Sequence, residues 1–333
     1  MINKAFFLFP GQGAQYPGMA LDLLESGGEK VKQLFSLASE IYGKEMAALL
    51  ADSSPDELKR TDLSQPAITL ANLAAAACLA ERGIKPCGCA GFSLGEYAAL
   101  AVAGVISEKD CFTLVTHRGR VMQAAIDRIT GGAAEGTSPG TLVRGASAPG
   151  MAAVIGLAPN QMEALIAEWK DDLADLYAAN INSPRQVVVS GSATALDEAE
   201  KRFKEAGARR FLRLQVAGPY HSPFMKEAAD AFAPFLAEVS FNNPVIPVFS
   251  NVTGKQIKTG MEAKALALCQ IVEAVRWADE EAAIAAAGGM DCLLETGPGK
   301  VLQGLWKDTG NEVPCYAAGT MAEISELAKA AEA

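Results

Sequence analysis

Short apolar segments alternate with long helical patterns along most of the chain, and this alternation restricts the possible folds strongly. The predicted strands and helices before residue 128 are, in chain order, residues 4–9, 65–82, 86–93, 94–105 and 108–127. Antiparallel neighbours need only a short turn, whereas parallel strands need a crossover of a dozen or more residues, usually a helix. The pattern therefore predicts an α/β fold with a central parallel sheet and helices on both faces.

A different order of elements occupies the middle of the chain. Residues 151–214 read as strand, helix, strand, strand, helix and strand, which is the order of a ferredoxin-like α+β unit with its own sheet. The first pattern resumes after Gly218, so the small unit is predicted to be inserted into the larger one. The predicted parts are a discontinuous large domain (1–128 and 215–320), a flexible glycine-rich loop (129–150), the ferredoxin-like subdomain (151–214) and a C-terminal helical tail (321–333).

Composition argues against several classes of protein. The chain has 333 residues, half of them hydrophobic, and a net charge of -10, whereas a general nucleic-acid binder needs a basic surface. The most apolar stretch, residues 67–80, is interrupted by Thr69 and Asn72, and the N-terminus lacks the pattern of a secretory signal. The seven cysteines are scattered, without metal-ligand spacing or a disulfide framework. A cytoplasmic monomer with no metal and no membrane contact is expected.

One segment departs from the acidic balance. Between residues 201 and 213, six basic residues face a single acid, Glu205. The six are Lys201, Arg202, Lys204, Arg209, Arg210 and Arg213. Two interpretations stay open: a solvated helix and strand face, or a docking patch for an acidic partner.

The first predicted strand runs into a glycine-containing loop, FFLFPGQGAQ (6–15). Gly11 and Gly13 are compatible with a dinucleotide-binding loop, but Tyr16 stands where the third glycine of G-x-G-x-x-G is needed. A phosphate-binding role is therefore disfavoured.

A second loop, GFSLGEY (91–97), matches the nucleophile-elbow pattern G-x-S-x-G. It lies between a predicted strand and a predicted helix, where a sharp turn exposes the serine hydroxyl above the sheet at a helix N-terminus. Ser93 is therefore the candidate nucleophile.

A serine nucleophile needs a base, and the chain has only two histidines. His117 faces away from the buried stripe of its predicted helix, so a surface or packing role is expected. His221 lies in a strand-to-helix loop, just before Ser222 and Pro223, which are typical of a helix N-terminus. No suitable aspartate lies between positions 93 and 221, so a backbone carbonyl is the candidate for orienting His221.

The helix at residues 108–127 carries one charge, Arg118, on its buried stripe. The apolar members of the stripe are Cys111, Leu114, Val115, Met122 and Ala125. An unpaired buried guanidinium is costly. Arg118 therefore has either an internal partner such as Glu96 or Glu295, or the role of a fixed cation that grips a ligand carboxylate beside the nucleophile.

Six motifs in register resemble those of the malonyl-CoA:acyl carrier protein transacylases, over nearly the whole chain. They are FPGQGAQ (9–15), GFSLGEY (91–97), HRGRVMQ (117–123), NSP (182–184), HSP (221–223) and ETGPGKVL (295–302). The resemblance implies a hydrolase-like large domain with a ferredoxin-like insertion. It also implies transfer of malonyl from malonyl-CoA to the phosphopantetheine thiol of an acyl carrier protein for fatty acid synthesis, with no permanently bound cofactor. An acidic carrier protein would suit a docking patch that includes Lys201, Arg202, Arg209 and Arg210.

The resemblance further implies roles for particular residues. Ser93 would be the nucleophile, His221 the base and then the acid, and Arg118 the clamp on the malonyl carboxylate. The backbone N–H groups of Gln12 and Leu94 would form the oxyanion hole. Carbonyls around Ser250 and Asn251 would orient the histidine.

The chain departs from the family pattern at three places. Phe92 stands where family members often carry histidine, and the glycine-rich loop at 130–150 is longer than usual. Tyr220 precedes the candidate base, where its bulk is expected to exclude an α-methyl group and favour malonyl.

Three alternatives remain. A serine thioesterase or hydrolase would use the same Ser93 and His221 but pass the acyl group to water, and Arg118 argues against it. The sequence does not distinguish well between an enzyme of fatty acid synthesis and a stand-alone acyltransferase that serves a polyketide synthase. A carrier-protein-binding module with a dead site is disfavoured, because all three candidate residues are present.

Overall fold

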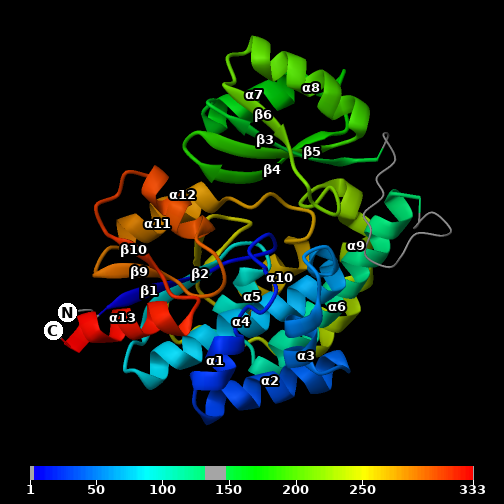
Figure 1. The fold of residues 1–333 in the computed structure, drawn as a ribbon. Helices are drawn as coiled ribbons and strands as arrows, with labels where there is room; N and C mark the ends of the chain where they lie inside the picture. Colours follow the sequence, from blue (N-terminus) through cyan, green and yellow to red (C-terminus); the bar gives the residue numbers. More distant parts are fainter. Residues whose placement is uncertain (1–3, 132–147, 333) are drawn as a thin grey trace.

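The computed structural model describes residues 4–131 and 148–332, which form two units (Figure 1). The larger unit is built on a six-stranded sheet and the smaller unit on a four-stranded sheet. Most of the predicted glycine-rich loop at 129–150 lies outside the described residues.

β1 (Ala5–Phe9) lies inside the larger sheet, whose strand order is β10-β9-β1-β2-β7-β8. The other strands are β2 (Pro86–Gly91), β7 (Val248–Ser250), β8 (Lys255–Ile257), β9 (Cys292–Glu295) and β10 (Cys315–Ala317). Neighbouring strands are parallel except for the edge pair β7 and β8. The predicted α/β class with a central parallel sheet is confirmed.

Helices cover both faces of this sheet because β1 is apolar on both. Phe7 and Phe9 point to one face, where they share a core with helices before the insertion, whereas Phe6 and Leu8 point to the other. The first face packs against α2 (Glu29–Tyr42), α4 (Thr61–Glu81), α5 (Gly95–Val102) and α6 (Glu108–Ile129). The second face packs against α11 (Trp277–Ala287) and α12 (Val301–Asp308).

The remaining helices of the larger unit lie around this core. They are α1 (Leu21–Ser26), α3 (Met46–Asp52), α9 (Lys226–Glu238), α10 (Gly260–Cys269) and α13 (Met321–Glu332), with 3-10 turns at Glu57–Lys59 and Pro223–Met225. Among the described helices, α4 is the one long and apolar enough to cross a membrane, but 89% of its apolar window is buried inside the protein, as in a core helix.

The smaller unit has the predicted ferredoxin-like order. Its elements are β3 (Gly150–Ile155), α7 (Pro159–Glu168), β4 (Leu176–Ser183), β5 (Gln186–Gly191), α8 (Ala193–Glu205) and β6 (Arg210–Arg213). The antiparallel sheet has the order β4-β5-β3-β6, and α7 and α8 cover its outer face (Figure 1). Met151 and Val188 on the other face join the core of the larger unit.

Backbone hydrogen bonds join the two units directly. Ile181 N–H in β4 donates to the carbonyl of Val275 at 2.8 Å, and Val275 N–H donates to Ala179 at 2.9 Å. The small sheet is therefore held against the segment that precedes α11, beside the end of β2.

Candidate active site

Ser93 lies in the sharp turn between β2 and α5. Its φ of 50° is in the left-handed region, which serine rarely adopts. Glycines on either side make the turn possible: a Cβ on Gly91 would lie 2.0 Å from the carbonyl carbon of Gly95, and a Cβ on Gly95 would lie 2.0 Å from the carbonyl oxygen of Phe9. The predicted strand-turn-helix context of Ser93 is therefore present.

Asn251, just after β7, holds this strained turn in place. Its Oδ1 accepts the Ser93 N–H at 2.5 Å, and its Nδ2 donates to the carbonyl of Gly91 at 2.7 Å. One side chain thus satisfies backbone groups on both sides of Phe92, which stabilises the elbow. The Phe92 ring itself packs edge-on against Trp277, with centroids 5.4 Å apart.

His221 lies beside the candidate nucleophile, with Nε2 2.8 Å from Ser93 Oγ. Its Nδ1 is 3.1 Å from the carbonyl oxygen of Gln270 and 3.0 Å from that of Glu273. Carbonyl oxygens only accept hydrogen bonds, so Nδ1 carries the proton and Nε2 is free to accept from the serine hydroxyl. Burial, with a smaller contribution from Arg118, lowers the pKa of His221 to about 4. The imidazole is therefore neutral at pH 7 and able to act as a base.

The prediction that carbonyls at Ser250 and Asn251 orient His221 is wrong. Those carbonyls accept the N–H groups of Gly254 and Arg276, each at 2.8 Å. The orienting carbonyls come instead from Gln270, which caps α10 and whose carbonyl has no partner within the helix, and from Glu273 in the turn that follows. No residue type marks such a carbonyl, so sequence reasoning missed Gln270 and Glu273.

Arg118 is on the buried face of α6, as predicted, and only 1% of its surface is exposed. Its Nη1 donates to Gln65 Oε1 at 2.9 Å and its Nη2 to Gln270 Oε1 at 3.3 Å. The guanidinium carbon also lies 5.5 Å from the centre of the Tyr97 ring. Sequence reasoning missed Gln65, although a glutamine within an apolar helix is a usable signal for a buried polar contact.

Neither carboxylate considered as an internal partner forms an ion pair with Arg118 in the described part of the chain. Glu295 accepts the backbone N–H groups of Val301 and Gln303 at the start of α12, at 3.0 and 2.8 Å. Glu96 accepts a hydrogen bond from the side chain of Gln270 instead. Arg118 therefore contacts neutral oxygens, and its charge stays available to an anionic ligand.

A cavity of about 240 Å³ brings these groups together between the two units. Its lining from the larger unit includes Gln12, Ser93, Leu94, Arg118, Met122, Tyr220 and His221, and from the smaller unit Met151, Asn182 and Val188. The candidate nucleophile, the candidate base and the buried cation thus line one cavity, bounded on the other side by the small sheet.

The opening loop packs directly on the elbow. A Cβ on Gly11 would lie 2.3 Å from the carbonyl oxygen of Phe92 and 3.6 Å from the backbone nitrogen of Leu94, so only glycine allows this approach. The Gln12 side chain donates to Tyr220 Oη at 3.2 Å. None of the hydrogen bonds found among the described residues uses the backbone N–H of Gln12 or Leu94.

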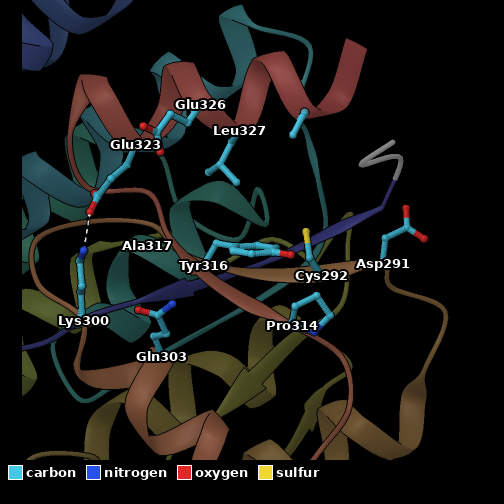
Figure 2. A pocket seen from close by; sticks show the side chains of 11 residues that line it. Asp291, Cys292, Lys300, Gln303, Pro314, Tyr316, Ala317, Glu323, Glu326 and Leu327 are labelled. Atoms are coloured by element: carbon cyan, nitrogen blue, oxygen red, sulfur yellow. Dashed lines mark ion pairs between the residues drawn. The ribbon is translucent and has the colours of Figure 1, made fainter. Parts of the chain in front are cut away.

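A larger cavity, of about 550 Å³, lies between β9, β10, α12 and α13, away from Ser93 (Figure 2). Its lysine, Lys300, is paired with Glu323 at 3.1 Å, and burial raises the pKa of Cys292 to about 11, so that thiol is protonated at neutral pH. Its lining residues include no histidine, so this cavity lacks an activated nucleophile.

The basic segment at residues 201–213 is largely neutralised. Four of its cations form ion pairs: Lys201 with Glu198, Arg202 with Asp172, Lys204 with Glu200, and Arg213 with Asp197. The expectation of a single facing acid was wrong, because helical spacing brings acids of α8 from before residue 201 next to the lysines. Arg209 and Arg210 are exposed and have no ion pair in the described ranges.

A serine in a nucleophile elbow, a neutral histidine at hydrogen-bond distance and a buried arginine in one cavity define an enzyme that moves acyl groups through a serine ester. Comparison with known proteins then specifies the family: the chain belongs to the acyl transferase domain family, whose model matches residues 6–330.

Similar proteins cover the whole chain. It is 37% identical over 330 residues to the malonyl CoA-acyl carrier protein transacylase of Escherichia coli K12, covering 98% of each. The crystal structure of an acyl carrier protein S-malonyltransferase from Vibrio cholerae O1 biovar eltor has a TM-score of 0.85 at 36% identity, covering 98% of this chain and 100% of the other. A malonyl-transacylase in complex with a type II polyketide synthase acyl-carrier protein has a TM-score of 0.85 at 33% identity, with coverage of 98% and 100%.

Proposed function

We propose that the enzyme transfers a malonyl group from malonyl-CoA to the phosphopantetheine thiol of an acyl carrier protein, through a malonyl ester on Ser93. The observation that carries this proposal is the shared cavity, in which a serine–histidine pair and a buried arginine without a carboxylate partner among the described residues lie together. A hydrolase of neutral esters has no use for a buried cation at this position.

In the first half-reaction, His221 Nε2 takes the hydroxyl proton as Ser93 Oγ attacks the thioester carbonyl. The tetrahedral intermediate collapses, the C–S bond breaks, and the imidazolium returns its proton to the CoA thiolate. The carbonyls of Gln270 and Glu273 stabilise the imidazolium by accepting from Nδ1, which is the role of the aspartate in a triad. In the second half-reaction, the carrier thiol attacks the serine ester and His221 first accepts and then returns a proton.

The oxyanion of each intermediate would be bound by the backbone N–H groups of Gln12 and Leu94. The close packing of Gly11 on the elbow and the absence of another acceptor for these donors among the described residues support this assignment. Leu94 also precedes the first turn of α5, whose positive end favours an anion.

Tyr220 is proposed to select against substituted malonyl groups. Its hydroxyl lies 2.6 Å from Thr61 Oγ1 and 3.2 Å from Gln12 Nε2, and only 8% of the residue is exposed. A buried ring whose hydroxyl is held by two hydrogen bonds does not swing aside easily, so an α-methyl group beside it would meet a fixed wall.

The direct test is to incubate the protein with malonyl-CoA, acetyl-CoA and methylmalonyl-CoA separately and measure intact and peptide masses. We expect one added malonyl group, on the peptide that contains Ser93, and its discharge when a carrier protein with a phosphopantetheine thiol is added. Rapid release of free malonate without any thiol acceptor would identify a hydrolase instead. An unmodified Ser93 peptide would contradict the proposal altogether.

Carrier docking is proposed at Arg209 and Arg210, the two cations of the segment 201–213 that are exposed and lack ion pairs in the described ranges. Arg210 is in register with Ile155 of β3, and Ile155 is in register with Gln186, which lines the cavity. Arg210 therefore lies level with a residue that lines the cavity, and the two exposed cations can attract an acidic carrier toward it.

Reversing both charges, with Arg209→Glu and Arg210→Glu, is expected to raise the KM for the carrier protein roughly tenfold and to weaken its dependence on salt. The matched control is Lys201→Glu with Lys204→Glu, two lysines already paired within α8. Steady-state kinetics at several ionic strengths measure the effect. If the KM for the carrier protein changed equally in the two double variants, the basic segment would be only a solvated face and the docking proposal would be wrong.

The carrier is proposed to belong to fatty acid synthesis, and a type II polyketide carrier is the alternative, which the polyketide transacylase neighbour supports. Competition between one carrier of each kind for the malonyl enzyme would separate them. The chemistry proposed here requires no cofactor, and a monomer in the cytoplasm stays a prediction.

A further inference from the structure

The side-chain amide of Gln270 connects the buried cation of the site to a buried acid. Its Oε1 accepts from Arg118 Nη2 at 3.3 Å, while its Nε2 donates to Glu96 Oε2 at 2.8 Å. The amide dipole is thereby oriented with its negative end toward the guanidinium and its positive end toward the carboxyl group. Arg118 and Glu96 thus interact through one intervening side chain, without a direct ion pair.

Glu96 lies three residues after Ser93, in the first turn of α5, and is 1% exposed. Besides Gln270, the backbone N–H of Asn251 donates to its Oε2 at 2.9 Å, and its Oε1 has no partner in the described part of the chain. Burial raises the pKa of Glu96 to about 7, against the opposing effects of Asn251, Gln270 and Arg118. Glu96 therefore changes charge near neutral pH.

The charged and titratable groups that face Glu96 come from several elements. They are Arg118 from α6, Glu280 from α11, Tyr97 from α5 and Cys269 at the end of α10. Burial and the proximity of Glu96 raise the pKa of Glu280 well above its usual value, and burial raises those of Tyr97 and Cys269. Tyr97 and Cys269 are therefore neutral at pH 7, the ionised form of Glu280 is disfavoured, and Arg118 is the permanent charge that Glu96 faces.

We infer that Glu96 is a positioning residue that sets acyl specificity: through Gln270 its carboxylate competes with the substrate carboxylate for Arg118, and its protonation increases the preference for malonyl over acetyl. This inference rests on the proposed function, because it takes Arg118 as the malonyl clamp. Glu96 itself does not touch the substrate.

The direction in which pH changes the preference for malonyl follows from the charge of Glu96. Above about pH 7 Glu96 is ionised and partly balances Arg118, so the malonyl carboxylate gains less on binding. Below that pH the guanidinium is uncompensated, and the substrate carboxylate, which has an ordinary pKa of about 4, remains ionised until far lower pH. By reciprocity, a malonyl group on Arg118 favours proton uptake at Glu96, whereas an acetyl group does not.

The experiment measures the ratio of kcat/KM for malonyl-CoA to kcat/KM for acetyl-CoA between about pH 5.5 and about pH 8.5, the range around neutrality that Glu96 would titrate in. Titration of His221 affects both substrates and cancels in the ratio. For the unaltered protein we expect the ratio to rise about five- to tenfold as pH falls, the size of a typical coupling between sites. For Glu96→Gln, which keeps an oxygen acceptor but removes the charge, we expect the low-pH ratio at every pH.

Glu281→Gln is the matched control. Glu281 is a second buried carboxyl group, with a pKa raised by burial to about 8, but its described partner is Trp277 Nε1 at 2.8 Å rather than Gln270. The ratio of kcat/KM values for the Glu281→Gln variant should vary with pH as it does in the unaltered protein. If Glu281→Gln flattened the profile as Glu96→Gln does, the effect would be general to buried acids and the inference would fail.

A flat ratio in the unaltered protein would overturn the inference by itself, so the test does not depend on whether Glu96→Gln folds. Failure of the proposed function looks different. In that case no malonyl ester forms on Ser93 at any pH, whereas a malonylated enzyme with a flat ratio refutes only the role of Glu96.

Discussion

Replacing Ser93 by alanine is expected to eliminate the acyl-enzyme and to lower the transfer rate by on the order of a millionfold, the loss seen when a nucleophile that acts as a unit with its base is removed. The physical reason is the geometry at His221 Nε2, whose described partner is Ser93 Oγ at 2.8 Å. Intact-mass measurement after exposure to malonyl-CoA and a carrier-transfer assay together measure both effects.

A double variant gives the sharper control. If Ser93 and His221 act as one unit, then Ser93→Ala with His221→Ala should cost no more than either change alone. Additive losses would mean that the two side chains contribute separately. A malonyl label that persists on Ser93→Ala would show that the nucleophile lies elsewhere.

Replacing Arg118 by alanine is expected to reduce the preference for malonyl-CoA over acetyl-CoA by about ten- to a hundredfold. A charge-assisted hydrogen bond contributes roughly 1.5 to 3 kcal/mol, and a malonyl carboxylate in the variant would lie in a buried cavity without its cation. Arg118→Lys should recover only part of the preference, because an ammonium group cannot donate two parallel hydrogen bonds to a carboxylate. Rates of ester formation with the two acyl-CoAs measure the preference.

Arg120→Ala is the matched control, since Arg120 is on the same helix but is exposed and donates to the carbonyl of Tyr42. It should leave the acyl preference as it is. Thermal unfolding of each variant separates a loss of specificity from a loss of fold. An Arg118→Ala protein that is folded and still prefers malonyl would exclude the clamp.

Much of the site could be predicted from local patterns. The elbow needs a strand, two small residues around a serine and a helix, all within one short segment, so Ser93 was identifiable from adjacent letters. Arg118 was identifiable because its helix repeats apolar residues every three or four positions, and a guanidinium on that stripe needs an explanation. The order of the elements likewise predicted two sheets and their classes.

Contacts between distant segments could not be predicted in this way. The acids that pair with the basic segment were misjudged because they lie outside it in the sequence: Glu198 and Glu200 are one helical turn before the lysines, and Asp172 and Asp197 are brought to the arginines by the fold. The carboxylates suggested for Arg118 were plausible by charge, yet the structure places Gln65 and Gln270 against it instead.

The sequence by itself determined the fold class, the candidate nucleophile, its candidate base and the buried cation, because each depends on residue type in a local pattern. Only the tertiary structure decided which backbone carbonyls orient His221 and which side chain links Arg118 to Glu96. The physical reason is that every residue carries the same carbonyl group, so its availability depends on where a helix ends in space and what packs against that end.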